Sequence, residues 1–216
     1  MIRFRNATVV LIIAIVASGC AAVEQYSLVP HGSRQVGNVV VPVTGAWNKV
    51  PGRMLAYARD DAEVWTREGV LLDRFIVIPG VPEGQPIFAQ KAESAALPEF
   101  QGGMLPHELA ELTESSIVKL FGEGNTTVST DNLRPHRFGE HRGVMFDFDA
   151  ITSAGPRYRG VVGTVQVDGK LYLLMYLAVY PYYFDKTLAD ATEQTEAARM
   201  AAGATAQIEA ARLAAG

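Results

Sequence analysis

Two histidines and two aspartates in the middle of the chain come closest to a catalytic or metal-binding set. His136 and His141 lie five residues apart, and Asp147 and Asp149 follow on one face of an alternating segment. Imidazole and carboxylate groups bind metal ions and transfer protons during hydrolysis. Arginines at positions 134, 137 and 142 disfavour a bound cation, so a solvated or anion-binding loop is the competing interpretation. A small hydrolase or metal-dependent enzyme built on these four residues is therefore our alternative hypothesis.

Other catalytic signatures in the sequence are incomplete. His107 and Glu108 begin a pattern close to the H-E-x-x-H zinc motif, but Glu111 replaces the second histidine. The sequence contains no G-x-S-x-G nucleophile elbow, no phosphate-binding loop with its lysine and no dinucleotide fingerprint. We therefore expect a protein that is not an enzyme and that uses no metal or other cofactor.

Aromatic residues near the end of the chain form a candidate face for a partner or ligand. This face consists of Tyr172, Tyr176, Tyr180, Tyr182 and Tyr183. The first three share one side of a predicted strand, where they would either pack beneath a helix or border a groove. We favour packing and keep two binding hypotheses open, a protein partner and an apolar ligand.

The single cysteine of the chain closes an export-signal pattern. Arg3 and Arg5 precede an apolar run from Val9 to Val16, and small residues fill positions 17–19 before Cys20. Eight apolar residues are far fewer than the roughly 20 that a helix needs to cross a bilayer. The segment is thus predicted to direct export.

The sequence Ala-Ser-Gly-Cys at positions 17–20 resembles the lipobox of bacterial lipoproteins, although Ala17 stands where leucine is usual. The resemblance implies a diacylglycerol thioether on Cys20 and a further acyl chain, such as palmitate, on its amino group. More than one acyl chain gives stable membrane attachment. Ala21 follows the cysteine instead of the aspartate of many inner-membrane lipoproteins, which implies the outer membrane. An ordinary signal peptide with an incidental cysteine is the alternative.

The charge of the chain agrees with attachment through lipid. The net charge is −4, and removal of residues 1–19 with their two arginines lowers it to −6. A negative domain is not expected to bind nucleic acid or to be held electrostatically on anionic lipid. We expect a cell-envelope protein that is anchored by lipid and binds another envelope protein.

Four segments follow from these patterns. They are a lipoprotein signal peptide at 1–19, a lipidated N-terminus and tether at 20–37, a globular α/β domain at 38–200 and an Ala-rich tail at 201–216.

The domain is predicted to contain two hairpins. Arg157 to Val167 and Lys170 to Tyr180 flank Asp168-Gly169, which is typical of a two-residue turn and sets Tyr172 opposite Val165 and Tyr176 opposite Val161. Segments 62–66 and 71–78 flank Gly69, and a two-residue turn there would set Glu63 opposite Arg74 and Trp65 opposite Leu72. The first hairpin is apolar on both faces and should be central in its sheet.

Helices and further strands complete the prediction. A helix from Pro106 to Phe121 has Pro106 in its first turn and stops at Gly122, and a second runs from about Asp185 to Gly203. Residues 143–150 alternate as a strand, and Pro42 makes residues 38–43 an edge strand or a strand start.

This order of elements resembles the PsbP family and its Mog relatives. It comprises the strand pair around Trp65 and Gly69, a middle helix, a late pair of long strands and a C-terminal helix. The resemblance implies an α+β fold with a single antiparallel-rich sheet and helices packed on it, an α/β/α sandwich. It implies no catalytic residues.

Overall fold

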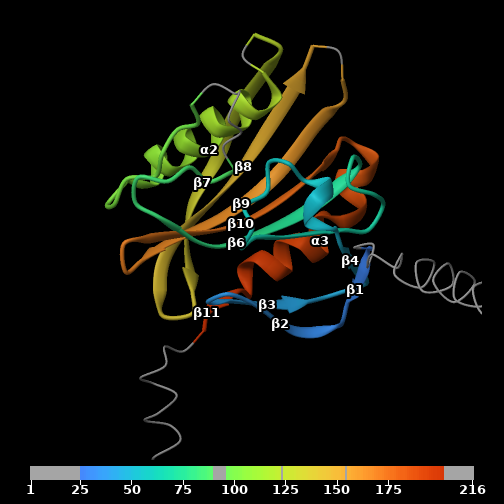
Figure 1. The fold of residues 1–216 in the computed structure, drawn as a ribbon, viewed down its shortest axis with the longest axis horizontal. Coiled ribbons are helices and arrows are strands. Elements are labelled where there is room, and N and C mark those ends of the chain that lie inside the picture. Colours follow the sequence, from blue (N-terminus) through green and yellow to red (C-terminus); the bar gives the residue numbers. More distant parts are fainter. Residues whose placement is uncertain (1–24, 90–95, 123, 154, 202–216) are drawn as a thin grey trace, which may run out of the picture.

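The computed structural model describes residues 25–89, 96–122, 124–153 and 155–201 (Figure 1). Cys20, the predicted signal segment and residues 202–216 of the predicted tail lie outside these residues. Among the described residues, no helix has the length and apolar character needed to cross a bilayer.

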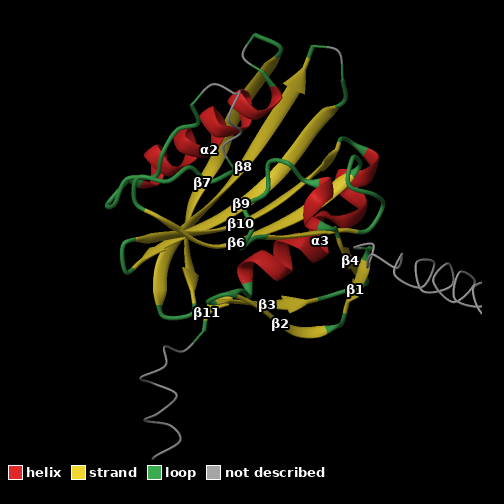
Figure 2. Ribbon diagram, in the orientation of Figure 1, coloured by secondary structure: helices red, strands yellow, loops and turns green. Residues whose placement is uncertain are grey.

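An antiparallel sheet of eight strands forms the centre of the domain, which confirms the predicted fold class (Figures 1 and 2). The long β9–β10 hairpin is central in this sheet, as its two apolar faces predicted. The strands, in spatial order, are β1 (Ser27–Val29), β4 (Trp47–Lys49), β5 (Glu63–Thr66), β6 (Asp73–Pro82), β10 (Lys170–Val179), β9 (Arg157–Val167), β8 (His141–Thr152) and β7 (Thr126–Phe138).

A small second sheet adds to the predicted architecture. It contains β2 (Gly32–Val36), β3 (Val39–Val43) and β11 (Arg199–Met200), with β3 in the middle. The tether predicted at 20–37 is therefore wrong in part, because β1 and β2 lie within it. The edge position predicted for β3 is also wrong. Pro42 is tolerated in the middle strand because β11 pairs only with Val39 and Val40.

Helices cover both faces of the large sheet and give the predicted α/β/α layering (Figure 2). Helix α2 runs from Pro106 to Phe121, as predicted, and the Glu108 carboxylate accepts a hydrogen bond from the Leu105 N–H at its start. Helix α3 spans Tyr182–Glu196 on the opposite face. It begins three residues earlier than predicted. It also ends earlier than predicted, because the chain beyond Ala197 forms β11. A short 3-10 helix, η1, spans Gly52–Met54.

One predicted hairpin register is confirmed and the other is wrong. In β9–β10, Asp168 and Gly169 have φ of 50° and 70°, and Val165 pairs with Tyr172 as predicted. In β5–β6, Glu63 pairs with Val77 and Trp65 pairs with Phe75. The loop is wider than two residues because the Asp73 carboxylate accepts hydrogen bonds from the Thr66 hydroxyl and from the backbone N–H groups of residues 67 and 68.

The two faces of the large sheet carry separate hydrophobic clusters. On the α3 face, Trp47, Trp65, Phe75 and Tyr176 are fully buried. Gly163 allows this close packing, because a Cβ there would lie 2.6 Å from the Thr195 Cγ2 atom of α3. On the other face, α2 and the segment between β6 and α2 cover the sheet.

Candidate functional site

The four residues of the enzymatic alternative lie on one hairpin, β7–β8, but do not form one site. His136 Nε2 lies 2.9 Å from the backbone oxygen of Glu196, and its ring contacts Phe138. His141 begins β8, six residues before Asp147. The predicted loop around these histidines is wrong, because β7 extends through Phe138 and only a tight turn joins it to β8.

The two aspartates are engaged by arginines. Asp147 accepts hydrogen bonds from Arg134 and Asn132, and Asp149 accepts them from Arg157. Within the described residues, no cluster of three or more histidine, cysteine, aspartate or glutamate side chains is arranged to hold a metal ion. The arrangement that the enzymatic hypothesis requires is therefore not assembled here.

The tyrosine face divides between core and surface. Tyr172 and Tyr176 are 4% and 0% exposed and pack beneath α3, so they cannot border an open groove. The Tyr176 hydroxyl donates to the backbone oxygens of Tyr183 and Phe184, and burial together with the Asp73 carboxylate raises the pKa of Tyr176. Tyr180 and Tyr183 are half-buried, whereas Tyr182 is 66% exposed.

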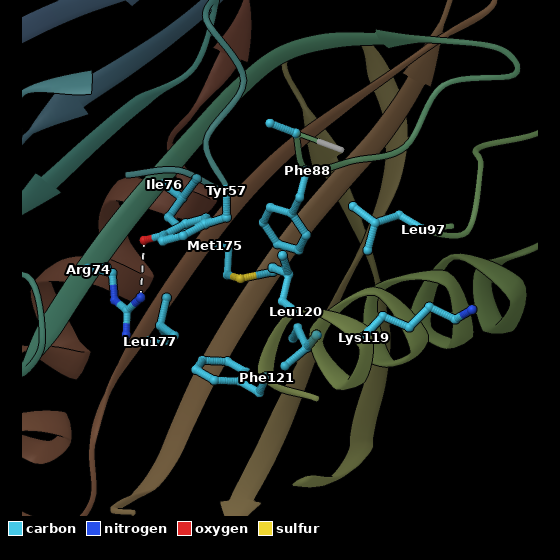
Figure 3. A pocket seen from close by; sticks show the side chains of 12 residues that line it. Tyr57, Arg74, Ile76, Phe88, Leu97, Lys119, Leu120, Phe121, Met175 and Leu177 are labelled. Carbon is cyan, nitrogen blue, oxygen red and sulfur yellow. Dashed lines mark hydrogen bonds between the residues drawn. The ribbon is translucent and has the colours of Figure 1, made fainter. Parts of the chain in front are cut away.

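A cavity of about 230 Å³ lies between the sheet and α2 (Figure 3). Strands β6 and β10 form its floor, and α2 and the segment before it form its walls. Most lining side chains are apolar, and they include Ile76, Phe88, Leu120, Phe121, Met175 and Leu177. This site was not predicted from the sequence, because its lining comes from parts of the chain that are far apart in sequence.

Arg74 is the polar group that distinguishes this cavity. It lies on β6 and is only 7% exposed. One guanidinium nitrogen donates to the Tyr57 hydroxyl at 3.1 Å, and the guanidinium lies over the rings of Tyr57 and Tyr158, at 5.8 and 5.6 Å from their centres. Within the part of the chain that the structure describes, its buried Nε has no hydrogen-bond partner and no carboxylate forms a salt bridge with Arg74.

The predicted partner of Arg74 lies on the other face of the sheet. The Glu63 carboxylate accepts hydrogen bonds from Arg34, Lys49 and the Trp65 indole. Burial acts to raise the pKa of Glu63, but these three hydrogen bonds outweigh it and hold the pKa below its usual value. In the predicted register of β5–β6, Glu63 would lie opposite Arg74 and neutralise its charge. In the observed register Glu63 pairs with Val77, and Arg74 has no carboxylate among the described residues. An arginine among apolar residues of β6 was the one signal of this site in the sequence.

Comparisons with known proteins identify a fold and no activity. No protein-family model matches the chain, and no curated protein matches it significantly. The solution structure of cyanobacterial PsbP (CyanoP) from Synechocystis sp. PCC 6803 has a TM-score of 0.55 and 9% identity, covering 84% of this chain and 97% of that one.

A second similar structure is LpqN, a protein involved in cell envelope biogenesis of Mycobacterium tuberculosis. Its TM-score is 0.44 with 12% identity, over 82% of this chain and 91% of that one. The similarity to CyanoP gives the described domain the PsbP-like fold that the order of its elements predicted.

Proposed function

We propose that this chain is a lipid-anchored protein of the cell envelope whose domain is a non-enzymatic binding domain for a small apolar ligand. The cavity beneath α2 is the observation that carries the proposal. Protein interiors contain few voids larger than a water molecule, and those that are apolar and open to ligands are the default binding sites. At about 30 Å³ for a water-sized group, 230 Å³ holds about eight such groups.

The lining supports an apolar ligand over a polar one. The exposed wall of the cavity consists mainly of aliphatic and aromatic side chains from β6, β10 and α2. Each buried methylene of a ligand would gain roughly 0.8 kcal/mol on leaving water. The cavity therefore favours a chain-like ligand of about eight carbons.

Calorimetric titration of octan-1-ol into the full-length Cys20→Ser chain tests this proposal, because no acyl chain on the protein then competes. We expect saturable binding that falls at least tenfold in Leu177→Phe, since the larger ring occupies the cavity. Ile151→Phe adds similar bulk at a residue that is 52% exposed outside the cavity, so it should bind normally. Absence of saturable binding, or equal binding by both variants, would contradict the proposal.

Attachment to the outer membrane through lipid on Cys20 is the second part of the proposal. Its support is the lipobox-like sequence and the position of β1, which begins at Ser27. Six residues separate Cys20 from β1 and span at most about 20 Å, so a lipidated Cys20 would hold the domain close to the membrane surface.

Membrane fractionation tests the anchor. Cys20→Ser should move the chain from the outer-membrane fraction to the soluble fraction and abolish labelling with palmitate, whereas Ala22→Ser should behave like the wild type. Membrane retention of Cys20→Ser would show that the assignment is wrong.

An envelope protein as a further partner remains a prediction. The exposed ring of Tyr182, in edge-to-face contact with Tyr183, is the part of the tyrosine face that a partner can reach. A photocrosslinker at position 182 in intact cells should trap one defined protein. No adduct there, under conditions that trap a control lipoprotein with its known partner, would remove this prediction.

A further inference from the structure

We propose that Arg74 and Tyr57 form a head-group site, and that the ligand of the cavity is an acyl chain of about eight carbons ending in a carboxylate. This inference rests on the proposed function, since it names the ligand class of the same cavity. Figure 3 shows Arg74 and Tyr57 together at one side of the cavity, with Leu97 and Lys119 at the other.

The Arg74 guanidinium is buried without a counter-charge among the described residues. It is more than nine-tenths buried, and among the described residues it makes one hydrogen bond, to a neutral hydroxyl. Its buried Nε has no partner there, as is also true of Arg67 and Arg159, but those two arginines contact carboxylates. Removing a charge from water is unfavourable unless an opposite charge or several hydrogen bonds replace the lost hydration. The contacts of the guanidinium with the rings of Tyr57 and Tyr158 compensate only a small part of the lost hydration energy. An anion in the cavity would supply the missing acceptor.

Other arginines of the domain show what Arg74 lacks. Arg34, Arg67, Arg134 and Arg157 are all more exposed than Arg74, and each of them contacts a carboxylate of the chain. The most buried of these arginines is thus the one without a counter-charge among the described residues. Stability alone does not explain this arrangement, because a buried unpaired cation disfavours folding.

The charged residues in the described lining of the cavity are all basic. Its described residues include Arg74 and Lys119 but no aspartate or glutamate, although the whole chain has a net charge of −4. Lys119 lies at the far rim, where its ammonium donates to the backbone oxygen of Ala96. Arg74 is therefore the charged group placed deepest against the apolar walls.

The geometry favours a carboxylate as the head group. A guanidinium donates two parallel hydrogen bonds to the two oxygens of a planar carboxylate. The Tyr57 hydroxyl accepts from Arg74 and can donate its own proton to the same anion. One buried guanidinium balances the single charge of a carboxylate, whereas a phosphate monoester carries about −1.5 to −2 and would be left partly uncompensated.

Calorimetric titration with four ligands of equal chain length tests the head group. Octanoate, octan-1-ol, octylamine and octyl phosphate are titrated into the full-length Cys20→Ser chain at pH 7. We expect octanoate to bind on the order of tenfold to a hundredfold more tightly than octan-1-ol, because a charge-assisted hydrogen-bond pair is gained. Octylamine should bind more weakly than octan-1-ol, and octyl phosphate more weakly than octanoate.

Variants assign the effect to Arg74. Arg74→Met should lower the ratio of octanoate affinity to octan-1-ol affinity to about one or less, and Tyr57→Phe should lower this ratio by a few fold. Arg142→Met, an exposed arginine on the β7–β8 hairpin, is the matched control and should change neither affinity. A cooperative urea denaturation transition shows that Arg74→Met is folded.

The outcomes separate this inference from the proposed function. If neither octanoate nor octan-1-ol binds, both are overturned. If both bind equally, or if Arg74→Met keeps the preference, only the head-group site is overturned. Tighter binding of octyl phosphate than of octanoate would overturn the carboxylate assignment.

Discussion

The two faces of the eight-stranded sheet are built from the same strands but differ in how completely they are packed. On the α3 face, Phe75 stacks on Trp65 with ring centres 5.5 Å apart and contacts Trp47 at 5.7 Å, and all three are fully buried. On the α2 face, the sheet and the helix leave a cavity of about 230 Å³. Both faces carry large buried hydrophobic clusters, and the α2 face, here called the open face in contrast to the closed α3 face, also has a cavity that is available for a ligand.

Two arginines on the β5–β6 hairpin show the same difference. Arg67 lies 4.4 Å from the centre of the Trp47 ring and bonds to the Asp190 carboxylate and the Thr44 backbone oxygen. Arg74 is more buried but contacts no carboxylate of the described chain. An arginine paired with a carboxylate inside the fold serves stability, whereas a buried arginine without such a carboxylate indicates a ligand.

Truncation of a phenylalanine should have the largest effect and should depend on the face. Phe75→Ala removes a ring packed between two tryptophans and should destabilise the domain by roughly 3–5 kcal/mol. Phe88→Ala removes a ring that already borders the cavity, so the loss should be smaller by about 1 kcal/mol or more. Urea denaturation measures both, and equal losses would mean that the two faces are packed alike.

Two leucines of β10 allow a direct comparison of the two faces of the sheet. Leu174 and Leu177 are three positions apart and therefore point to opposite faces. Leu174→Phe overfills the closed α3 face and should cost about 1–3 kcal/mol. Leu177→Phe places the same added volume in the cavity and should change the free energy of unfolding by less than about 0.5 kcal/mol. The denaturation midpoints of the two variants measure these losses. A larger loss of stability in Leu177→Phe than in Leu174→Phe would show that the cavity cannot accept the added ring.

Replacing each arginine with methionine compares the two charges directly. Arg67→Met loses the contact with Trp47, the bond to Thr44 and an ion pair that solvent weakens, so we expect a loss of about 1–2 kcal/mol. Arg74→Met removes a buried, unpaired charge and should leave stability unchanged or raise it. Thermal unfolding without ligand checks both. A loss for Arg74→Met as large as for Arg67→Met would assign Arg74 a structural role.

The smallest effect concerns the acid stability of the closed face. The pKa of Glu63 lies below its ordinary value of 4.5, because three hydrogen bonds outweigh the burial that would raise it. Its contribution is therefore present above the unfolded-state pKa and is lost as pH falls through the folded-state pKa. Glu63→Gln should lower stability at pH 7 but flatten the decline between about pH 5 and pH 3. Parallel pH profiles of the two proteins would contradict this role.

Local patterns were sufficient for the elements whose ends are marked by particular residues. Asp168-Gly169 fixed the register of β9–β10, and Pro106 and Gly122 marked the limits of α2. The end of α3 was missed because residues 199–200 pair with β3, a strand about 160 residues away, so a distant contact overrides the helical pattern.

The cavity depends on contacts that the sequence does not display. Arg74 lacks a carboxylate because the Asp73 side chain holds a wide loop and shifts the register of β5–β6, which moves Glu63 to the opposite face. The remaining walls come from α2 and from residues before it. The apolar and charged residues of the site could be read individually, but their convergence is a property of the tertiary structure.

The measurement that tests this account most directly is methyl NMR of the full-length Cys20→Ser chain during titration with octanoate. We predict saturable shift changes for Ile76, Leu120 and Leu177, which line the cavity, and none for Leu174 and Val161 on the α3 face. Shift changes that are absent from the cavity, or equal on both faces, would contradict the division of the sheet into a closed face and a ligand-binding face.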